Sequence, residues 1–336
     1  MEKNNVVHEI TKTMNIDLVY MWVDGNDPEW QKKQAQYRNE AVNPSEETVG
    51  QCRYIQFDEL RYAIRSAIQN APWINNIYIV TDNQCPWWLN KDNPKIKIID
   101  HKDIIDTKYL PLFNSSAIEL NICNIPGLSE HFLLGNDDTF FGRPVKPSFF
   151  FNANGTPIIR LKNKRIKKGF SPYQDMLYNM VDEIKQKYGS CTLLAPHHNI
   201  DAYCKSDWKK CLEEYSGWFK ETMTHRFRHY QDMHRHLISL WMIKHKRASV
   251  RIVSRWNRIY GIWGHIKAVW KKKYASDSRY ISIIVKDFDQ YMLRHNPTLF
   301  NINDTPKGTR EDRLRAMKFL KKRFPIPTPF EVLNRN

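Results

Sequence analysis

Short apolar runs that end in acidic or amide residues recur along the first 140 residues. Residues 16–23 are mostly apolar and rich in strand-forming types, and they stop at the turn-forming sequence 24–28, Asp-Gly-Asn-Asp-Pro. Later apolar runs end at Asp82, Asp100 and Asn136. Runs of this kind are typical of buried central strands, so the pattern predicts four strands whose carboxyl ends carry polar groups.

Helical periodicity separates these predicted strands. Apolar residues recur every three or four positions between residues 60 and 71, and Pro72 ends the run. Ser116 and Glu119 have the spacing of a capping box, which predicts the start of a second helix with an apolar face. Alternating strands and helices predict a doubly wound α/β core of Rossmann type with a mostly parallel sheet.

The remainder of the chain is more basic and less regular, so we predict four segments. Residues 14–150 form the α/β core, 151–195 a basic insertion, 196–310 the second half of the site, and 311–336 a basic helix and tail. Within the third segment, residues 255–274 interleave aromatic and cationic side chains at helical spacing. Two interpretations stay open for that stretch: a helix lying in a membrane interface and an aromatic helix buried in the core.

The stretch 131–138 is the strongest candidate for chemistry. It ends in Asn136, Asp137 and Asp138, and ligands of open α/β sheets bind beyond the carboxyl ends of strands. No glycine-rich phosphate-binding motif occurs at a strand-to-helix turn. Because oxygen ligands suit Mg²⁺ or Mn²⁺, the stretch predicts a divalent cation that neutralises a phosphorylated ligand. A plain polar turn is the alternative.

Further candidates lie later in the chain. His197 and His198 are adjacent after a proline, and histidine can take a proton near neutral pH. Arg228 precedes a predicted helix, where a guanidinium suits a phosphate, and an ordinary surface charge is the alternative. Asp304 ends another short apolar run. The cations at 162–168 form either a solvated loop or a flap over an anionic substrate.

Composition and charge narrow the class of protein. Hydrophobic residues make up 41% and aromatic residues 13% of the 336 residues, which argues against a disordered chain. The formal charge of +16 indicates anionic partners: nucleic acid, nucleotides, phosphorylated sugars or a membrane face. The six cysteines show no metal-site spacing, and no secretory signal or spanning apolar run is present. We therefore expect a cytoplasmic protein able to attach peripherally to the inner face of the membrane.

With these stretches assembled, the chain resembles the Stealth family of sugar-1-phosphate transferases. The resemblance is carried, in the family's order, by Ile16-Asp-Leu-Val-Tyr-Met-Trp-Val-Asp-Gly-Asn-Asp27, by residues 58–147, by Pro196-His-His-Asn-Ile-Asp201 with Arg226-Phe-Arg-His-Tyr-Gln-Asp-Met233, and by Phe300-Asn-Ile-Asn-Asp304. The compact length is similar to that of bacterial members, such as the streptococcal receptor polysaccharide phosphotransferases.

The resemblance implies a core like that of GT-A glycosyltransferases and a defined reaction. Hexose-1-phosphate or N-acetylhexosamine-1-phosphate would pass from a UDP-sugar to a hydroxyl of a glycan acceptor, with release of UMP. The expected acceptor is a lipid-linked oligosaccharide, an anionic membrane is an expected contact, and nucleic acid is not an expected partner. Two alternatives stay open: a metal-dependent UDP-sugar glycosyltransferase that releases UDP, and a basic nucleic-acid-binding protein.

The resemblance also implies roles for individual residues. Those assigned to the donor are Trp22, Val23, Asp24, Gly25 and Asn136, and those assigned to Mg²⁺ or Mn²⁺ are Asp137, Asp138 and Asp304. His197 would be the general base, Arg228 would stabilise the transferring phosphoryl group, and Asp304 is a further catalytic carboxylate. The adjacent His198 leaves the identity of the base open.

Overall fold

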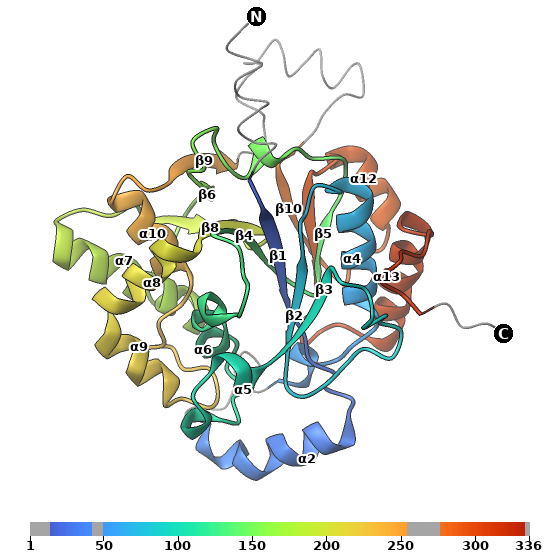
Figure 1. Cartoon of the computed structure of the whole chain (residues 1–336), viewed down its shortest axis with the longest axis horizontal. Coiled ribbons are helices and arrows are strands. Elements are labelled where there is room, and N and C mark those ends of the chain that lie inside the picture. Colours follow the sequence, from blue (N-terminus) through green and yellow to red (C-terminus); the bar gives the residue numbers. More distant parts are fainter. Residues whose placement is uncertain (1–13, 42–49, 254–275, 333–336) are drawn as a thin grey trace, which may run out of the picture.

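The computed structural model describes residues 14–41, 50–253 and 276–332 (Figure 1). The aromatic and basic stretch 255–274 lies outside these ranges, so both of its interpretations stay predictions. Within the described ranges, no helix is long and apolar enough to cross a bilayer.

A five-stranded sheet forms the centre of the molecule. Its strands, in spatial order, are β3 (Ile96–Asp100), β2 (Ile77–Thr81), β1 (Ile16–Met21), β4 (His131–Asn136) and β8 (Asp201–Cys204). The first four are parallel, and β8 runs antiparallel to β4. The predicted mostly parallel α/β core is therefore confirmed, with the four predicted strands in it.

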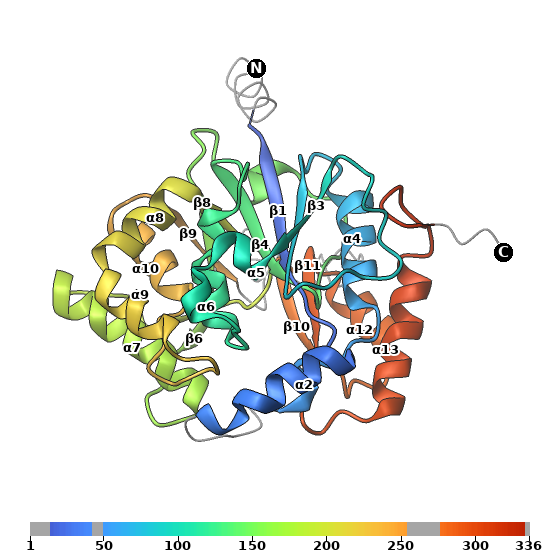
Figure 2. The same cartoon turned by 60° about the horizontal axis from the view of Figure 1, so that its bottom comes forward.

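Helices cover both faces of this sheet. Their bounds are α2 (Pro28–Tyr37), α4 (Glu59–Asn70), α5 (His101–Ile104), α6 (Ser115–Leu120), α7 (Pro172–Tyr188), α8 (Lys205–Glu214), α9 (Ser216–Met223), α10 (His236–Lys244), α12 (Phe288–His295) and α13 (Arg310–Arg323). Helices α4, α12 and α13 lie on one side of β1, and α6 to α10 lie on the other (Figures 1 and 2). The predicted basic helix near the C-terminus is α13.

Strand β1 shows why both faces are covered. Leu18 and Tyr20 pack into the core that contains α4, whereas Val19 packs into the core that contains α6 to α10. Successive strand residues point to opposite faces, so an unbroken apolar run requires an apolar layer on each side.

Two small sheets bring late parts of the chain to the end of β4. One has the order β10 (Ser278–Ser282), β11 (Leu299–Asn303), β5 (Thr139–Phe141). The other has the order β7 (Leu194–Pro196), β6 (Ile158–Arg165), β9 (Ser249–Val253). Asp137 and Asp138 form the turn from β4 into β5, and β5 pairs with β11 through Phe140 and Phe300. The end of β11 is thereby brought to the end of β4.

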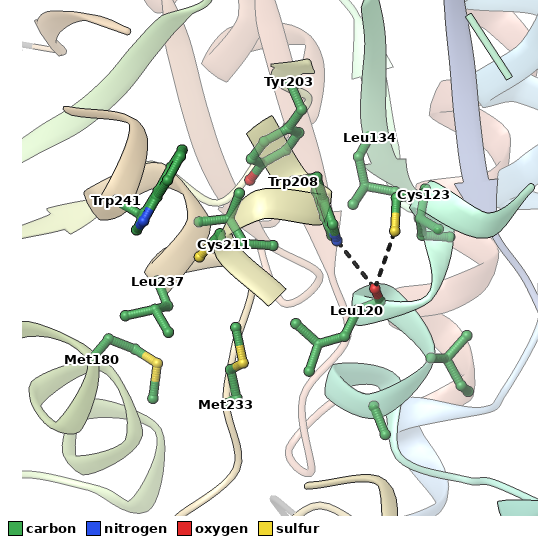
Figure 3. Close-up of a cluster of buried hydrophobic side chains, with 14 of the residues drawn as sticks. Leu120, Cys123, Leu134, Met180, Tyr203, Trp208, Cys211, Met233, Leu237 and Trp241 are labelled. Atoms are coloured by element: carbon green, nitrogen blue, oxygen red, sulfur yellow. Dashed lines mark hydrogen bonds between the residues drawn. The ribbon is translucent and has the colours of Figure 1, made fainter. Parts of the chain in front are cut away.

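The core on the α6 to α10 side is built around Trp208, which is fully buried (Figure 3). Its indole Nε1 donates to the Leu120 carbonyl oxygen at 3.1 Å, and its ring lies 4.7 Å from that of Tyr203. Leu237 of α10 belongs to the same cluster. Strand β8 and helices α6, α8 and α10 are therefore held as one body beside β4.

Helix α6 differs from its prediction. The N-cap is Asn114, whose side chain accepts from the Ser116 backbone N–H at 3.1 Å, so the predicted Ser116 and Glu119 capping box is wrong. Glu119 is instead turned inward, where its Oε1 lies 3.4 Å from Arg235 Nη1. Tertiary pairing with Arg235 outweighs the local capping preference because both groups are buried and a buried charge needs a partner.

Candidate functional site

A cavity of about 560 Å³ opens at the carboxyl ends of β1 and β4. In the central sheet, β2 and β3 lie on one side of β1, and β4 lies on the other side. The strand order therefore reverses at β1, beside this cavity. Trp22 and Val23 follow β1, and Asn136, Asp137 and Asp138 end β4 and follow it; all five line the cavity. A reversal point of this kind is where open α/β sheets bind ligands.

The carboxylates at the end of β4 are only partly hydrogen-bonded. Asp137 Oδ2 accepts from Gln56 Nε2 at 2.9 Å, and Asp138 Oδ2 accepts from Asn301 Nδ2 at 3.3 Å. Asp138 Oδ1 and Asn136 Oδ1 are buried and accept no hydrogen bond from any described residue. Buried oxygens in this condition are costly, so they mark a place for a bound group.

Burial and mutual repulsion raise the pKa values of the carboxyl groups in this cluster. Burial raises the pKa of Asp137 to about 6, and burial together with the charge of Asp137 raises the pKa of Asp138 to about 7. Burial and the same Asp137 charge raise the pKa of Glu59, which also lines the cavity. Carboxylate and amide oxygens are the ligands that Mg²⁺ and Mn²⁺ prefer, so these residues could hold such an ion, and its presence stays a prediction.

Asp304 reaches the same cavity from the end of β11. Its Oδ2 accepts from Arg313 Nε at 2.7 Å, and its Oδ1 accepts from the Thr305 backbone N–H at 2.7 Å. A Cβ on Gly308 would lie 2.4 Å from Oδ1, so a glycine there leaves room for the carboxylate. The structure thus brings Asp304 to the site with its orientation set, while its role in metal binding stays a prediction.

The two adjacent histidines are separated by the fold. His197 is 2% exposed and is not among the residues that line the cavity. Its Nε2 lies 2.6 Å from Asp201 Oδ1 and its Nδ1 lies 3.0 Å from Ser278 Oγ, so both ring nitrogens are engaged. His198 lines the cavity, with a backbone φ of 52°. The structure therefore favours His198 over His197 as the imidazole that meets a ligand.

The electrostatics keep His198 neutral. Burial, the charge of Arg235 and the charge of Lys162 lower its pKa to about 3. A pKa this low makes His198 a weak base in the protein without ligands, because general bases work best when their pKa lies near the operating pH.

Arg228 supplies a cation to the cavity. Its Nη2 donates to Ser115 Oγ at the start of α6, and its Nε is buried with no hydrogen-bond partner among the described residues. Burial, and then the charge of Arg53, lowers the pKa of Arg228 to about 10, so it remains charged at neutral pH. A guanidinium with an available N–H is suited to an oxyanion.

Several cavity residues were missed by the sequence patterns. Arg235 lies between two carboxylates, with Nη1 3.4 Å from Glu119 Oε1 and Nη2 4.0 Å from Asp201 Oδ2. His234 and Gln56 also line the cavity. The sequence did contain a signal for Arg235 and His234. Residues 234–236 are three consecutive basic residues at the start of an apolar helix, and basic side chains in a buried segment need polar or charged partners.

Two predicted donor-binding residues lie elsewhere. Asp24 and Gly25 do not line the cavity. Asp24 Oδ1 accepts from the Asn26 backbone N–H at 2.9 Å, and a Cβ on Gly25 would lie 2.3 Å from the Tyr54 carbonyl oxygen. Gly25 is therefore required because the backbone of Tyr54 lies against it, and not because a ligand approaches. Asp24 and Gly25 form the turn that follows Trp22 and Val23.

The fold and the cavity define an α/β protein with a ligand site at the reversal point of a mostly parallel sheet. Residues 14–41 match conserved region 1 of the Stealth proteins, and residues 53–159 match their conserved region 2. An exopolysaccharide phosphotransferase of Lactiplantibacillus plantarum is 34% identical over 265 residues, with 69% of this chain and 74% of that protein covered. The chain belongs to the Stealth protein family.

Other relatives extend the match along the chain. An exopolysaccharide phosphotransferase of Streptomyces coelicolor is 32% identical over 331 residues, with 94% of this chain and 52% of that protein covered. A capsular polysaccharide phosphotransferase of Neisseria meningitidis is 36% identical over 225 residues, with 65% and 61% covered. The chain thus spans about half to three fifths of the length of these two relatives.

Among solved structures, the galactosyltransferase LgtC in complex with donor and acceptor sugar analogues aligns with a TM-score of 0.43 and 12% identity. The alignment covers 95% of this chain and 98% of that protein.

Proposed function

We propose that the protein transfers hexose-1-phosphate or N-acetylhexosamine-1-phosphate from a UDP-sugar to a hydroxyl of a glycan acceptor and releases UMP. The observation that carries the proposal is the gathering of Asp137, Asp138, Arg228 and His198 around one cavity. Phosphoryl transfer depends on positioning and charge neutralisation, which carboxylate-held metal, an arginine and a base supply. The names of the relatives support phosphotransfer in capsular and extracellular polysaccharide synthesis.

The donor is assigned to the β1 and β4 side of the cavity. Trp22 and Val23 border the nucleotide, because they lie at the reversal point of the sheet. Asn136, Asp137 and Asp138 would hold Mg²⁺ or Mn²⁺, which would neutralise the diphosphate of the donor. Asp304 is proposed as a further carboxylate of this set.

In the proposed step, the acceptor oxygen forms a bond to the β-phosphorus of the donor. The bond from that phosphorus to the oxygen bridging it to the α-phosphorus breaks, and UMP leaves with the bonding electrons. The bond between the anomeric carbon and its oxygen stays intact, so the sugar keeps its configuration. Arg228 faces the negative charge on the phosphoryl oxygens.

His198 is proposed as the base that takes the proton of the acceptor hydroxyl. It lines the cavity and is neutral, whereas both ring nitrogens of His197 are engaged with Asp201 and Ser278. The negative charge of bound donor and acceptor raises the pKa of the His198 imidazole, so His198 is a stronger base when both substrates are bound. His197 is proposed to position the loop that carries His198.

The acceptor is proposed to be a lipid-linked oligosaccharide at the inner face of the membrane. The formal charge of +16 supports this proposal, because a cationic surface is attracted to anionic lipid.

The test is a panel of UDP-sugars and glycan acceptors, incubated with and without Mg²⁺ or Mn²⁺ and scored for the nucleotide released. We expect UMP and a phosphodiester product in equal amounts, with loss of turnover in Asp138→Asn. Asp289→Asn is the matched control, since Asp289 is an exposed residue of α12 paired with Lys322. Release of UDP would identify a glycosyltransferase, and salt-sensitive nucleic-acid binding without turnover would also overturn the proposal.

A further inference from the structure

Two lysines of β6 line the cavity beside His198. Lys162 and Lys164 are two positions apart on β6, and both border the cavity. Strand β6 pairs with β7, which ends at Pro196 and leads directly into the histidine loop. The basic run 162–168 was expected to be either a solvated loop or a flap over the substrate. Two of its lysines, Lys162 and Lys164, line the cavity.

Among the described residues, neither lysine is paired with a carboxylate. No carboxylate of the described residues lies within 4.0 Å of Lys162 or Lys164. Lys162 Nζ lies 5.8 Å from the ring centre of Tyr280, and Lys164 Nζ lies 5.9 Å from that of Phe170. Burial, and then the charge of Lys164, lowers the pKa of Lys162. An anion placed between the two ammonium groups would relieve both the repulsion and the desolvation.

Tyr280 connects this lysine pair to the proposed base. Its ring centre lies 6.2 Å from that of His198, it lines the cavity, and it is 44% exposed. Lys162, Tyr280 and His198 therefore form one continuous wall. If the acceptor hydroxyl gives its proton to His198, the rest of the acceptor lies against Tyr280 and Lys162.

We propose that Lys162 and Lys164 form a phosphate subsite for the acceptor, so that the preferred acceptor carries a phosphate ester close to the hydroxyl that is modified. This inference rests on the proposed function, because it takes His198 to mark the acceptor side of the cavity. Lysine ammonium groups are point-charge ligands for phosphate, and a phosphate that bridges two of them needs no metal.

A phosphate ester can reach this subsite from two sources. The proposed reaction itself leaves a phosphodiester in its product, so a product that is extended again presents one. A sugar joined to a lipid through a diphosphate presents the same chemistry. Both sources place an anionic oxygen group within a sugar's length of an acceptor hydroxyl.

The test compares three acceptors with the full chain and its preferred UDP-sugar. The first is two hexoses joined by a phosphodiester, the second is the same two hexoses joined by a glycosidic bond, and the third is one hexose on the diphosphate of a short prenyl lipid. We expect the KM of the first or the third to be at least about tenfold below that of the second. The lower of these two KM values identifies the source of the phosphate.

The variant is Lys162→Gln with Lys164→Gln, and the matched control is Lys167→Gln with Lys168→Gln. The control removes the same charge from exposed positions of the same segment that do not line the cavity. We expect the first pair to abolish the preference for the phosphorylated acceptor and to leave the KM of the donor unchanged. The control pair should behave like the wild type.

Failure of the subsite and failure of the proposed function give different results. Normal release of UMP with equal use of all three acceptors overturns the subsite alone, and so does a rise in the donor KM of the Lys162 and Lys164 variant. The absence of UMP release with every donor overturns the proposed function. Calorimetric titration of the two disaccharides without donor then measures the subsite directly, and equal affinity for both would overturn it.

Discussion

Gln56 Nε2 donates a hydrogen bond of 2.9 Å to Asp137 Oδ2, at the end of β4. The Oε1 of the same amide accepts from Trp22 Nε1 at 2.9 Å, just beyond the end of β1. One side chain therefore ties together the two strand ends that border the cavity. It also orients the Asp137 carboxylate, which is a proposed metal ligand.

Replacement of Gln56 tests this support. In Gln56→Ala we expect the affinity for Mn²⁺ to fall about 10-fold to 100-fold, because groups that orient metal ligands contribute on this scale. The measurement is the Mn²⁺ concentration that gives half-maximal turnover, with calorimetric titration of Mn²⁺ as a second readout. Gln186→Ala, on the exposed face of α7, is the control and should leave both unchanged. An unaltered Mn²⁺ dependence in Gln56→Ala would contradict the supporting role.

The adjacent histidines should respond differently to substitution. His198→Ala should lower kcat at least about 100-fold with little change in thermal stability, because a general base contributes on this scale. His197→Ala should lower the unfolding temperature, because it leaves the half-buried Asp201 without its 2.6 Å partner. The measurements are single-turnover rates and thermal unfolding of both variants. Near-normal turnover in a folded His198→Ala variant would exclude it as the base.

The ion pair between His225 and Asp232 should make stability depend on pH. His225 Nδ1 lies 2.7 Å from Asp232 Oδ1, and this hydrogen bond raises the pKa of His225. His229 lies beside it with a ring separation of 4.8 Å, and burial lowers its pKa. Because the folded pKa of His225 is raised, its stabilisation is present below the unfolded value of 6.5 and is lost as pH rises through the folded value.

The measurement is the free energy of unfolding in urea, from about pH 6 to about pH 9, for the wild type and His225→Gln. The difference between the two should shrink as the pH rises. A difference that stays constant over this range would show that His225 is not charged in the folded protein.

Glu331 should be important for stability and unimportant for turnover. It is 5% exposed, and its carboxylate accepts from Arg61 Nε at 2.6 Å and from Arg65 Nε and Nη2 at 2.7 Å. Glu331→Ala leaves Arg65 buried without its carboxylate, so we expect a loss of about 3–5 kcal/mol in the free energy of unfolding.

The control is the exposed pair of Lys322 and Asp289, where Asp289→Ala should cost no more than about 1 kcal/mol. Urea unfolding measures both variants. Equal losses of unfolding free energy in the two variants would contradict a stabilising role for the buried ion pairs of Glu331 with Arg61 and Arg65 of α4.

Local features of the chain follow from its sequence pattern, whereas long-range contacts do not. Strands β1 to β4 and helix α4 were predicted because their apolar periodicity reflects burial of the segment itself. The capping box at Ser116 failed because the spacing rule does not include Asn114, which caps the helix, or Arg235, which draws Glu119 inward. Asp24 and Gly25 do not line the cavity, and Gly25 packs closely against Tyr54, a long-range contact that no local pattern predicts. Their role in donor binding stays a prediction.

The sequence by itself determined the α/β class, the acidic turn at Asp137 and Asp138, and the set of residue types available for phosphoryl transfer. The tertiary structure decided which of those residues meet at one cavity. Alternation of apolar residues along a strand is a local property, so it can be read from the chain. The separation of His197 from His198, and the meeting of Arg228 and Asp304 with the end of β4, depend on how the small sheets and α10 pack against the central sheet.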